Sequence, residues 1–243
     1  MKQQKRIHGL DSLRGMTLVS MMAYHACWDL VWIWGKDWAW YRSEWAYLWQ
    51  QSICWTFILL SGYCFLMGRK PWKRGAMAFG GGLLVTAVTL VAMPEAPAIW
   101  GVLTFLGSAT LLTVPLKNLF LRLDSRLGLA GSFSLFLLLR DVSDGFCGFE
   151  GIHLLVLPEE LYRNLFTAWL GFPAEGFVSS DYFGLLPWIF LFWTGLFLYR
   201  LHPGDAKTGL RVPGITAMGR HSLLVYLLHQ PIIYGVLMLL YGI

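Results

Sequence analysis

Long apolar runs separated by short polar stretches dominate this chain. Seven runs approach or reach the length of about 17–25 residues that a helix needs to cross a membrane. They lie at about residues 12–34, 46–68, 75–93, 98–116, 127–140, 183–200 and 218–240. The pattern predicts an all-α, polytopic integral membrane helical bundle of about seven transmembrane helices, in a single domain over 1–243.

Residues 141–182 interrupt this pattern with an unusually long polar connection. It holds an apolar stretch at 152–157, then Pro158, then an amphipathic run over 159–170. Long connections of this kind are often lids or binding loops. We expect an interfacial or re-entrant helix here, covering one face of the bundle.

Composition supports the membrane assignment. The chain is 56% hydrophobic and only 14% charged, whereas soluble domains average about 25% charged residues. Its net charge of +5 comes from basic residues between the apolar runs, so we predict membrane lipid rather than nucleic acid as the surrounding partner. The first apolar run is too long to be a cleavable signal peptide.

The loop charges predict an orientation. Basic residues gather in alternate loops, which places those loops in the cytoplasm: Lys2, Lys5 and Arg6; Arg69, Lys70, Lys73 and Arg74; Lys117, Arg122 and Arg126; Arg200, Lys207 and Arg211. The other loops are richer in acidic residues. We therefore expect a multi-pass protein of the cell membrane with a cytoplasmic N-terminus and an extracytoplasmic C-terminus.

Small residues suggest packing rather than ligand binding. The four cysteines show no metal-ligand spacing, so we expect small buried hydrophobes and no metal. Glycines at 80–82 fall within an apolar run, where they favour close helix contact.

Ionisable side chains in the first run are the leading functional candidates, because they are costly inside a membrane. Arg14 and His25 are eleven residues apart, which is three helical turns, so they share one face about 16 Å apart along the axis. Arg14 is suited to a phosphate near the membrane surface. Asp29 lies one further turn along and can accept a hydrogen bond from the His25 ring, leaving the other ring nitrogen as a base.

A second histidine lies in the last run. His229 is nine residues after Arg220, about 13–14 Å, a depth similar to that of His25. Ser222, Tyr226 and His229 fall on one helical face. Arg220 and the helix start predicted near Gly219 form a candidate anion site.

Asp181 precedes the sixth run. It is a candidate to bind an acceptor substrate, and equally a candidate N-cap for the sixth helix.

Three stretches together resemble bacterial members of the heparan-alpha-glucosaminide N-acetyltransferase catalytic domain family. They are residues 7–16 with His25 and Asp29, residues 180–188, and residues 219–231. The Arg14–His25 spacing also resembles the wider acyltransferase type 3 proteins. Two positions depart from the family pattern, Thr104 where we expect histidine and Gly184 where proline is commoner.

The resemblance implies an acyl-CoA-dependent acyltransferase. It would move an acyl group, usually acetyl, from cytoplasmic acetyl-CoA to a sugar amine or hydroxyl beyond the membrane, with Arg14 and His25 as an essential pair. The hypothesis assigns His25, Asp29 and His229 to catalysis. It assigns Arg14, Arg220, Ser222 and Tyr226 to the donor, and Asp181 to the glycan or amino-sugar acceptor.

Two other functions stay open at this stage. His25 and His229 could be axial ligands of haem in an electron-transfer protein, or the buried His and Asp could relay protons in a transporter. The acyl chain length, the acceptor and the oligomeric state, including a homodimer, are not specified by the sequence.

Overall fold

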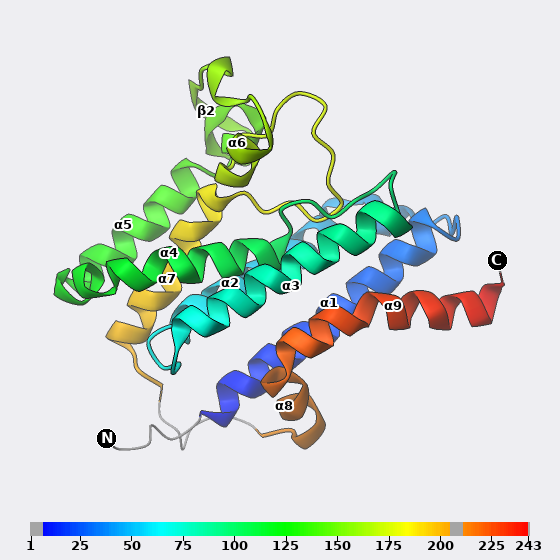
Figure 1. The fold of residues 1–243 in the computed structure, drawn as a ribbon, viewed down its shortest axis with the longest axis horizontal. Helices are drawn as coiled ribbons and strands as arrows, with labels where there is room; N and C mark the ends of the chain where they lie inside the picture. The colour runs from blue at the N-terminus through cyan, green and yellow to red at the C-terminus, as the bar shows by residue number, and fades with distance from the viewer. Residues whose placement is uncertain (1–6, 205–210, 243) are drawn as a thin grey trace. The chain divides into compact units, whose positions relative to one another are not determined.

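The computed structural model describes residues 7–204 and 211–242, which are mostly helical. The basic residues Lys2, Lys5, Arg6 and Lys207, which enter the orientation hypothesis, lie outside the described residues. The long helices coincide with the seven predicted runs: α1 (His8–Trp32), α2 (Glu44–Tyr63), α3 (Pro71–Ala92), α4 (Val102–Arg122), α5 (Ser125–Leu138), α7 (Leu185–Leu201) and α9 (Ser222–Tyr241). Figure 1 shows these helices in chain order.

Three helices in the described part of the chain, α3, α4 and α9, are long and apolar enough to cross a membrane. The helices α5 and α7 are apolar but shorter. The membrane character is therefore supported, whereas the seven-span count stays a prediction.

The chain divides into two compact units. Unit 1 comprises Met1–Leu60 and Gly204–Ile243, and unit 2 comprises Ser61–Pro203. Unit 1 contains α1, most of α2, the short helix α8 (Pro213–Arg220) and α9. Its core is built on Leu18, Met21 and Ile53.

Within unit 1, α1 contacts both α8 and α9, and Figure 1 shows α9 alongside α1. A short 3-10 helix, η1 (Ala39–Arg42), also packs on α1. Its residue Tyr41 is buried, and its hydroxyl donates to the Tyr24 carbonyl at 3.1 Å. Burial raises the pKa of Tyr41 above its ordinary value.

Unit 2 packs its helices in pairs, α3 with α4 and α5 with α7. Glycine makes the close approach possible, because a Cβ on Gly82 would lie 2.5 Å from the backbone nitrogen of Thr104. The predicted packing role of the glycine run is confirmed at Gly82, whereas Gly80 faces open space. The same contact explains why a small residue suits position 104.

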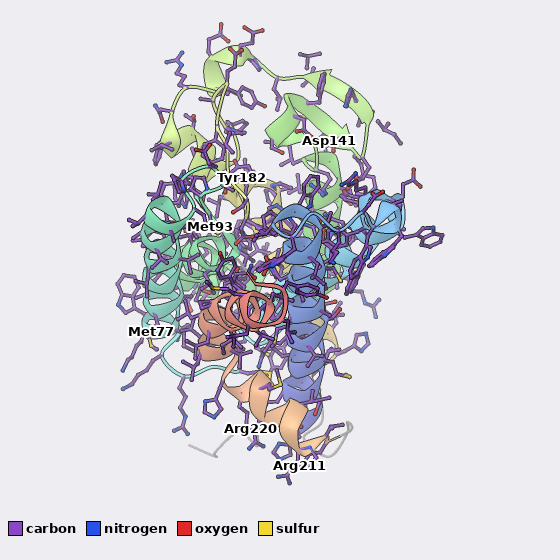
Figure 2. All side chains as sticks on the ribbon, turned by 90° about the vertical axis from the view of Figure 1, so that its right-hand side faces the viewer. Met77, Met93, Asp141, Tyr182, Arg211 and Arg220 are labelled. Carbon is purple, nitrogen blue, oxygen red and sulfur yellow. The ribbon has the colours of Figure 1, made fainter. Side chains whose placement is uncertain are left out.

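Residues 141–182 differ from the expected single helix. They contain the 3-10 helices η2 (Val142–Asp144) and η3 (Glu159–Leu161), a hairpin of β1 (Phe146–Phe149) and β2 (Ile152–Val156), and the short α6 (Leu165–Leu170). Glu150 and Gly151 form the two-residue turn with φ of 47° and 88°, the conformation that closes a tight hairpin. Both oxygens of Asp141, labelled in Figure 2, accept from the N–H groups of these two turn residues at 3.0 Å.

The expected helix is present only as the short α6, for a local reason. The β-branched Ile152 and Val156 favour a strand, and Gly151 provides the positive φ that reverses the chain. The amphipathic run at 159–170 begins with η3 and becomes α-helical only from Leu165, where Asn164 and Thr167 form a capping box.

Candidate active site

A ladder of side-chain contacts joins α1 to α9 in unit 1. His25 meets His229 with ring centroids 4.9 Å apart, Asp29 bonds Gln230, and Trp34 meets Tyr234 with centroids 5.4 Å apart. Residue numbers rise together along the ladder, so α1 and α9 run in the same direction. The polar residues of two separate apolar runs therefore meet along one seam.

The two imidazoles form the centre of this ladder. His229 is 5% exposed, and its Nδ1 is hydrogen-bonded to the Tyr226 carbonyl. A carbonyl can only accept, so in the neutral ring Nδ1 carries the proton and Nε2 keeps its lone pair. That Nε2 atom is buried and has no hydrogen-bond partner among the described residues. His229 thus presents a basic nitrogen, and its ring packs edge-on against the half-buried ring of His25.

Asp29 does not have the partner that its spacing from His25 suggested. Its Oδ1 accepts from Nε2 of Gln230 at 2.7 Å, and its Oδ2 has no hydrogen-bond partner in the described part of the chain. Asp29 is fully buried. The interhelix partner replaces the intrahelix one because α9 brings Gln230 alongside Asp29.

Gln230 is the residue that sequence reasoning passed over. Its only signal was an amide beside His229 within an apolar run. An amide there must find a polar partner, but the sequence could not say that the partner is Asp29.

Two arginines meet at the start of α1. Nη1 of Arg14 lies 3.3 Å from one Asp11 oxygen, and Nε of Arg220 lies 3.6 Å from the other. Arg14 also donates to the Gly219 carbonyl at 3.4 Å, and Nη2 of Arg220 is 3.0 Å from Nδ1 of His8. Among the described residues, this cluster therefore holds two guanidinium groups and one carboxylate.

Glycines beside these arginines allow the helices to cross. A Cβ on Gly15 would lie 2.0 Å from the Ile215 carbonyl oxygen, and one on Gly219 would lie 1.8 Å from the Asp11 carbonyl oxygen. The backbones of α1 and α8 are therefore in direct contact. Figure 2 labels Arg220 at the end of α8 beside the first turns of α1.

Arg14 and His25 share the face of α1 that their spacing predicts. Arg14 contacts Gly219 of α8, and His25 contacts His229 of α9. Because α8 leads directly into α9, the positive cluster and the imidazole pair lie along the same side of α1.

The predicted helix start near Gly219 is wrong. Gly219 and Arg220 end α8, and α9 starts at Ser222. The His221 N–H is bonded to the carbonyls of Ala217 and Met218, so it is not available to an anion. Of the groups predicted there, the Arg220 guanidinium keeps the charge suited to an anion.

The other donor-site candidates lie along α9. Ser222 is its first residue, and Tyr226 lies one turn further. The Tyr226 ring packs against the Leu18 cluster, and its centroid is 5.2 Å from that of His229.

Asp181 lies in unit 2 and has a structural contact there. Its Oδ2 accepts from the Val102 N–H at 3.2 Å, so it binds the start of α4. The N-cap residue of α7 is Gly184, and the prediction that Asp181 caps the sixth predicted helix is wrong. Gly101 permits this contact, because a Cβ there would lie 2.5 Å from the same carboxylate oxygen.

Comparison with known proteins gives one match. Residues 6–231 match the family model described as "Heparan-alpha-glucosaminide N-acetyltransferase, catalytic". The matched range extends from before α1 to Pro231 and includes all the candidate residues named above. No curated protein and no solved structure matches the chain.

Proposed function

The chain belongs to the heparan-alpha-glucosaminide N-acetyltransferase catalytic family, and from this premise we propose that it is a membrane acetyltransferase that uses acetyl-CoA as donor. The observation that carries the proposal is the arrangement along α1. A positive cluster lies at its start, and a pair of imidazoles lies about three turns further on.

The donor site is proposed at Arg14 and Arg220. Their excess positive charge around Asp11 suits the phosphates of CoA, and charge-assisted hydrogen bonds to phosphate are strong. The rise of about 16 Å from Arg14 to His25 suits an extended pantetheine arm that carries the thioester to the histidines. Ser222 and Tyr226 lie on α9 between Arg220 and His229, where they would line the arm.

The chemistry is proposed at His25 and His229. His25 takes a proton from the N–H or O–H of the acceptor, whose nitrogen or oxygen attacks the thioester carbon. The C–S bond breaks, the acetyl group stays on the acceptor, and the thiolate of CoA takes the proton from the imidazolium. The His229 ring packs against that of His25, so its Nε2 would assist the base, which is the role first expected of Asp29.

The sidedness is also a proposal. Basic loops suggest that the donor enters from the cytoplasm and that a glycan or amino-sugar acceptor enters from outside, in the cell membrane. The single substitutions Lys70→Cys, Arg211→Cys and Glu160→Cys, each in a cysteine-free background, test it with a membrane-impermeant thiol reagent. We expect the Glu160→Cys protein to be labelled in intact cells, and the Lys70→Cys and Arg211→Cys proteins only after permeabilisation. Labelling of the Lys70→Cys and Arg211→Cys proteins from opposite sides of the membrane would refute the orientation.

Activity is tested with purified protein, acetyl-CoA and glucosamine, by mass spectrometry of the acetylated sugar and by release of free CoA thiol. We expect transfer by the wild type and by the control variant His153→Ala. His153 lies on the exposed strand β2, where its ring stacks on Phe146 of β1. His25→Ala should lose transfer while keeping its fold. A fully active His25→Ala protein would remove this mechanism.

The two rival functions fare differently. The centroids of the two histidine rings are only 4.9 Å apart in an edge-on arrangement. This separation leaves no space for a porphyrin between the rings, so haem ligation is not proposed. The buried Asp29 and His229 also suit proton relay in a transporter, which predicts neither acetyl-CoA hydrolysis nor transfer in the same assay.

A further inference from the structure

Several buried polar atoms on the α1–α9 ladder have no hydrogen-bond partner within the described residues. They are Oδ2 of Asp29, Nε2 of His229, Oε1 of Gln230 and, just after α1, Nε1 of Trp34. Buried polar groups are nearly always satisfied in proteins, so a cluster of exceptions calls for an explanation. Asp29 lies about one turn after His25, and Gln230 directly follows His229, so three of these atoms belong to the imidazole pair or its nearest neighbours.

We propose that Asp29 and Gln230 form an acceptor-binding subsite that positions a primary amine against the histidines. This inference rests on the proposed function and adds the residues that hold the acceptor. It moves acceptor recognition from Asp181, which binds the start of α4, to the seam between α1 and α9.

The hydrogen-bond chemistry of the subsite suits an amine. Oδ2 of Asp29, Oε1 of Gln230 and Nε2 of His229 are all acceptors. A primary ammonium group has three N–H bonds to offer them, whereas a hydroxyl has one. The Asp29 carboxylate is fully buried and pairs with no Lys or Arg in the described part of the chain. A bound cation would therefore supply the missing opposite charge.

Gln230 acts here as a positioning residue. Its NH₂ group is engaged by Oδ1 of Asp29, so its own carbonyl oxygen must turn away from that atom, and Asp29 is left with Oδ2 for a ligand. The pair thus leaves two acceptor atoms for a ligand, Oδ2 of Asp29 and Oε1 of Gln230. The bound ammonium first gives one proton to Nε2 of His229, and the neutral amine then attacks the thioester carbon. As the C–S bond breaks, His25 takes a second proton from the nitrogen and passes it to the CoA thiolate, so the product amide keeps one N–H. His229 then returns its proton to solvent.

The test compares glucosamine with glucose as probes, in binding titrations without donor and in transfer assays with acetyl-CoA. The variants are Asp29→Asn, Gln230→Leu and the exchanged pair Asp29→Asn with Gln230→Glu. The exchanged pair keeps an amide–carboxylate bond between the helices, so it serves where a single variant fails to fold. Ser132→Ala is the control, because it loses a buried helix-to-helix hydrogen bond in unit 2.

We expect the wild type to bind glucosamine in preference to glucose. Asp29→Asn should weaken glucosamine binding by at least about tenfold and raise its KM similarly, since a charge-assisted bond is lost. Gln230→Leu should have a smaller effect in the same direction. The KM for acetyl-CoA and the binding of CoA should not change, and Ser132→Ala should match the wild type.

Two results would overturn the subsite. One is unchanged glucosamine binding in a folded Asp29→Asn protein. The other is a loss of stability in the single variants that is recovered in the exchanged pair, with an unchanged KM for glucosamine in all of them. That pattern describes a purely structural bond. Failure of the proposed function would look different, since acetyl-CoA would then be neither bound nor consumed by the wild type.

Discussion

The two units differ in whether all their buried polar side chains have hydrogen-bond partners. In unit 2, the buried Ser, Thr and Asp side chains are all satisfied, most of them by a carbonyl one turn back on the same helix: Thr104, Ser108, Thr113, Ser132, Asp141 and Thr194. In unit 1, the buried Ser12, Thr17 and Thr216 are satisfied in a similar way. The buried Asp29 and His229 of unit 1 differ, because each keeps an atom without a partner in the described part of the chain. A polar group that is satisfied by its own helix has no bonding capacity left for a ligand, whereas a buried atom without a partner calls for an explanation.

Glycine contacts show the same contrast. Gly82 of unit 2 lets α3 meet α4 beside Thr104, a residue bonded to its own helix. Gly15 and Gly219 of unit 1 let α1 meet α8 beside two arginines. The same packing device therefore serves stability in one unit and brings charge together in the other.

Among the variants that test this comparison, the largest effect is expected from removing the unpartnered Nε2 of His229. His229→Phe keeps a ring of similar size and should keep the packing against His25. We expect transfer to fall by roughly 10²- to 10⁴-fold, the range for loss of acid–base catalysis, as measured by acetyl-sugar formation. If His229→Phe keeps most of the activity, the unpartnered Nε2 has no chemical role and the contrast between the units loses its functional meaning.

Gly219→Ala should separate α1 from α8. The new methyl group would lie 1.8 Å from a backbone oxygen, so the helices must move apart, at roughly 1–3 kcal/mol as for other overpacked sites. We expect a lower unfolding temperature together with weaker acetyl-CoA binding. Gly214→Ala on the same helix is the control, since nothing lies within 4 Å of its Cβ position. Equal effects at both positions would contradict the contact.

Gly82→Ala extends this comparison to unit 2. It should lower stability without changing the affinity for acetyl-CoA, and Gly80→Ala is its matched control. A loss of donor affinity in a folded Gly82→Ala protein would contradict the assignment of the donor site to unit 1.

Arg14→Ala, and more weakly Arg220→Ala, should reduce acetyl-CoA affinity. Loss of a charge-assisted contact costs about 1.5–3 kcal/mol, roughly 10- to 150-fold in affinity. Calorimetric titration with CoA measures it, and the exposed Arg163 of unit 2 provides the control substitution. Unchanged affinity in a folded Arg14→Ala protein would reduce Arg14 to an anchor of α1 and point instead to Arg69, Lys70, Lys73 and Arg74.

Ser132→Ala should cost little and leave function intact. Its hydroxyl bonds the Gly128 carbonyl and Thr194, and a typical buried hydrogen bond contributes about 0.5–1.5 kcal/mol. We expect a small fall in unfolding temperature with unchanged transfer kinetics. A large loss of transfer would show that satisfied polar groups of unit 2 also take part in function.

The smallest effect concerns Asp124, the exposed N-cap of α5. The backbone N–H groups of Leu127 and Arg126 hold the pKa of its carboxyl below the ordinary value. Such a group stabilises the fold at pH above its unfolded pKa, and the contribution disappears as pH falls through the lower folded pKa. The difference in unfolding temperature between wild type and Asp124→Ala should therefore be present at pH 7 and shrink below about pH 4. A difference that grows on acidification would contradict this assignment.

The apolar pattern was sufficient to predict the helices. Each predicted run became a helix because length and hydropathy act locally, and Pro94 and Pro97 come directly after α3, as expected of residues that lack an N–H. The pattern failed in residues 141–182, where a turn with positive φ at Glu150 and Gly151 produced a hairpin. A short apolar run is ambiguous between strand and helix until its turns are known.

The sequence by itself determined which residues are costly to bury, and so it identified Arg14, His25, Asp29 and His229. Helical spacing also placed Arg14 and His25 on one face. The sequence did not determine the contact partners of these side chains, because spacing along one helix does not specify which residues of another helix lie against it. Only the tertiary structure paired Asp29 with Gln230, brought His25 against His229, joined Arg14 to Arg220 through Asp11, and bound Asp181 to the start of α4. Those contacts depend on the parallel alignment of α1 with α9 and on the glycines at the α1–α8 crossing, which are properties of packing between segments about 200 residues apart.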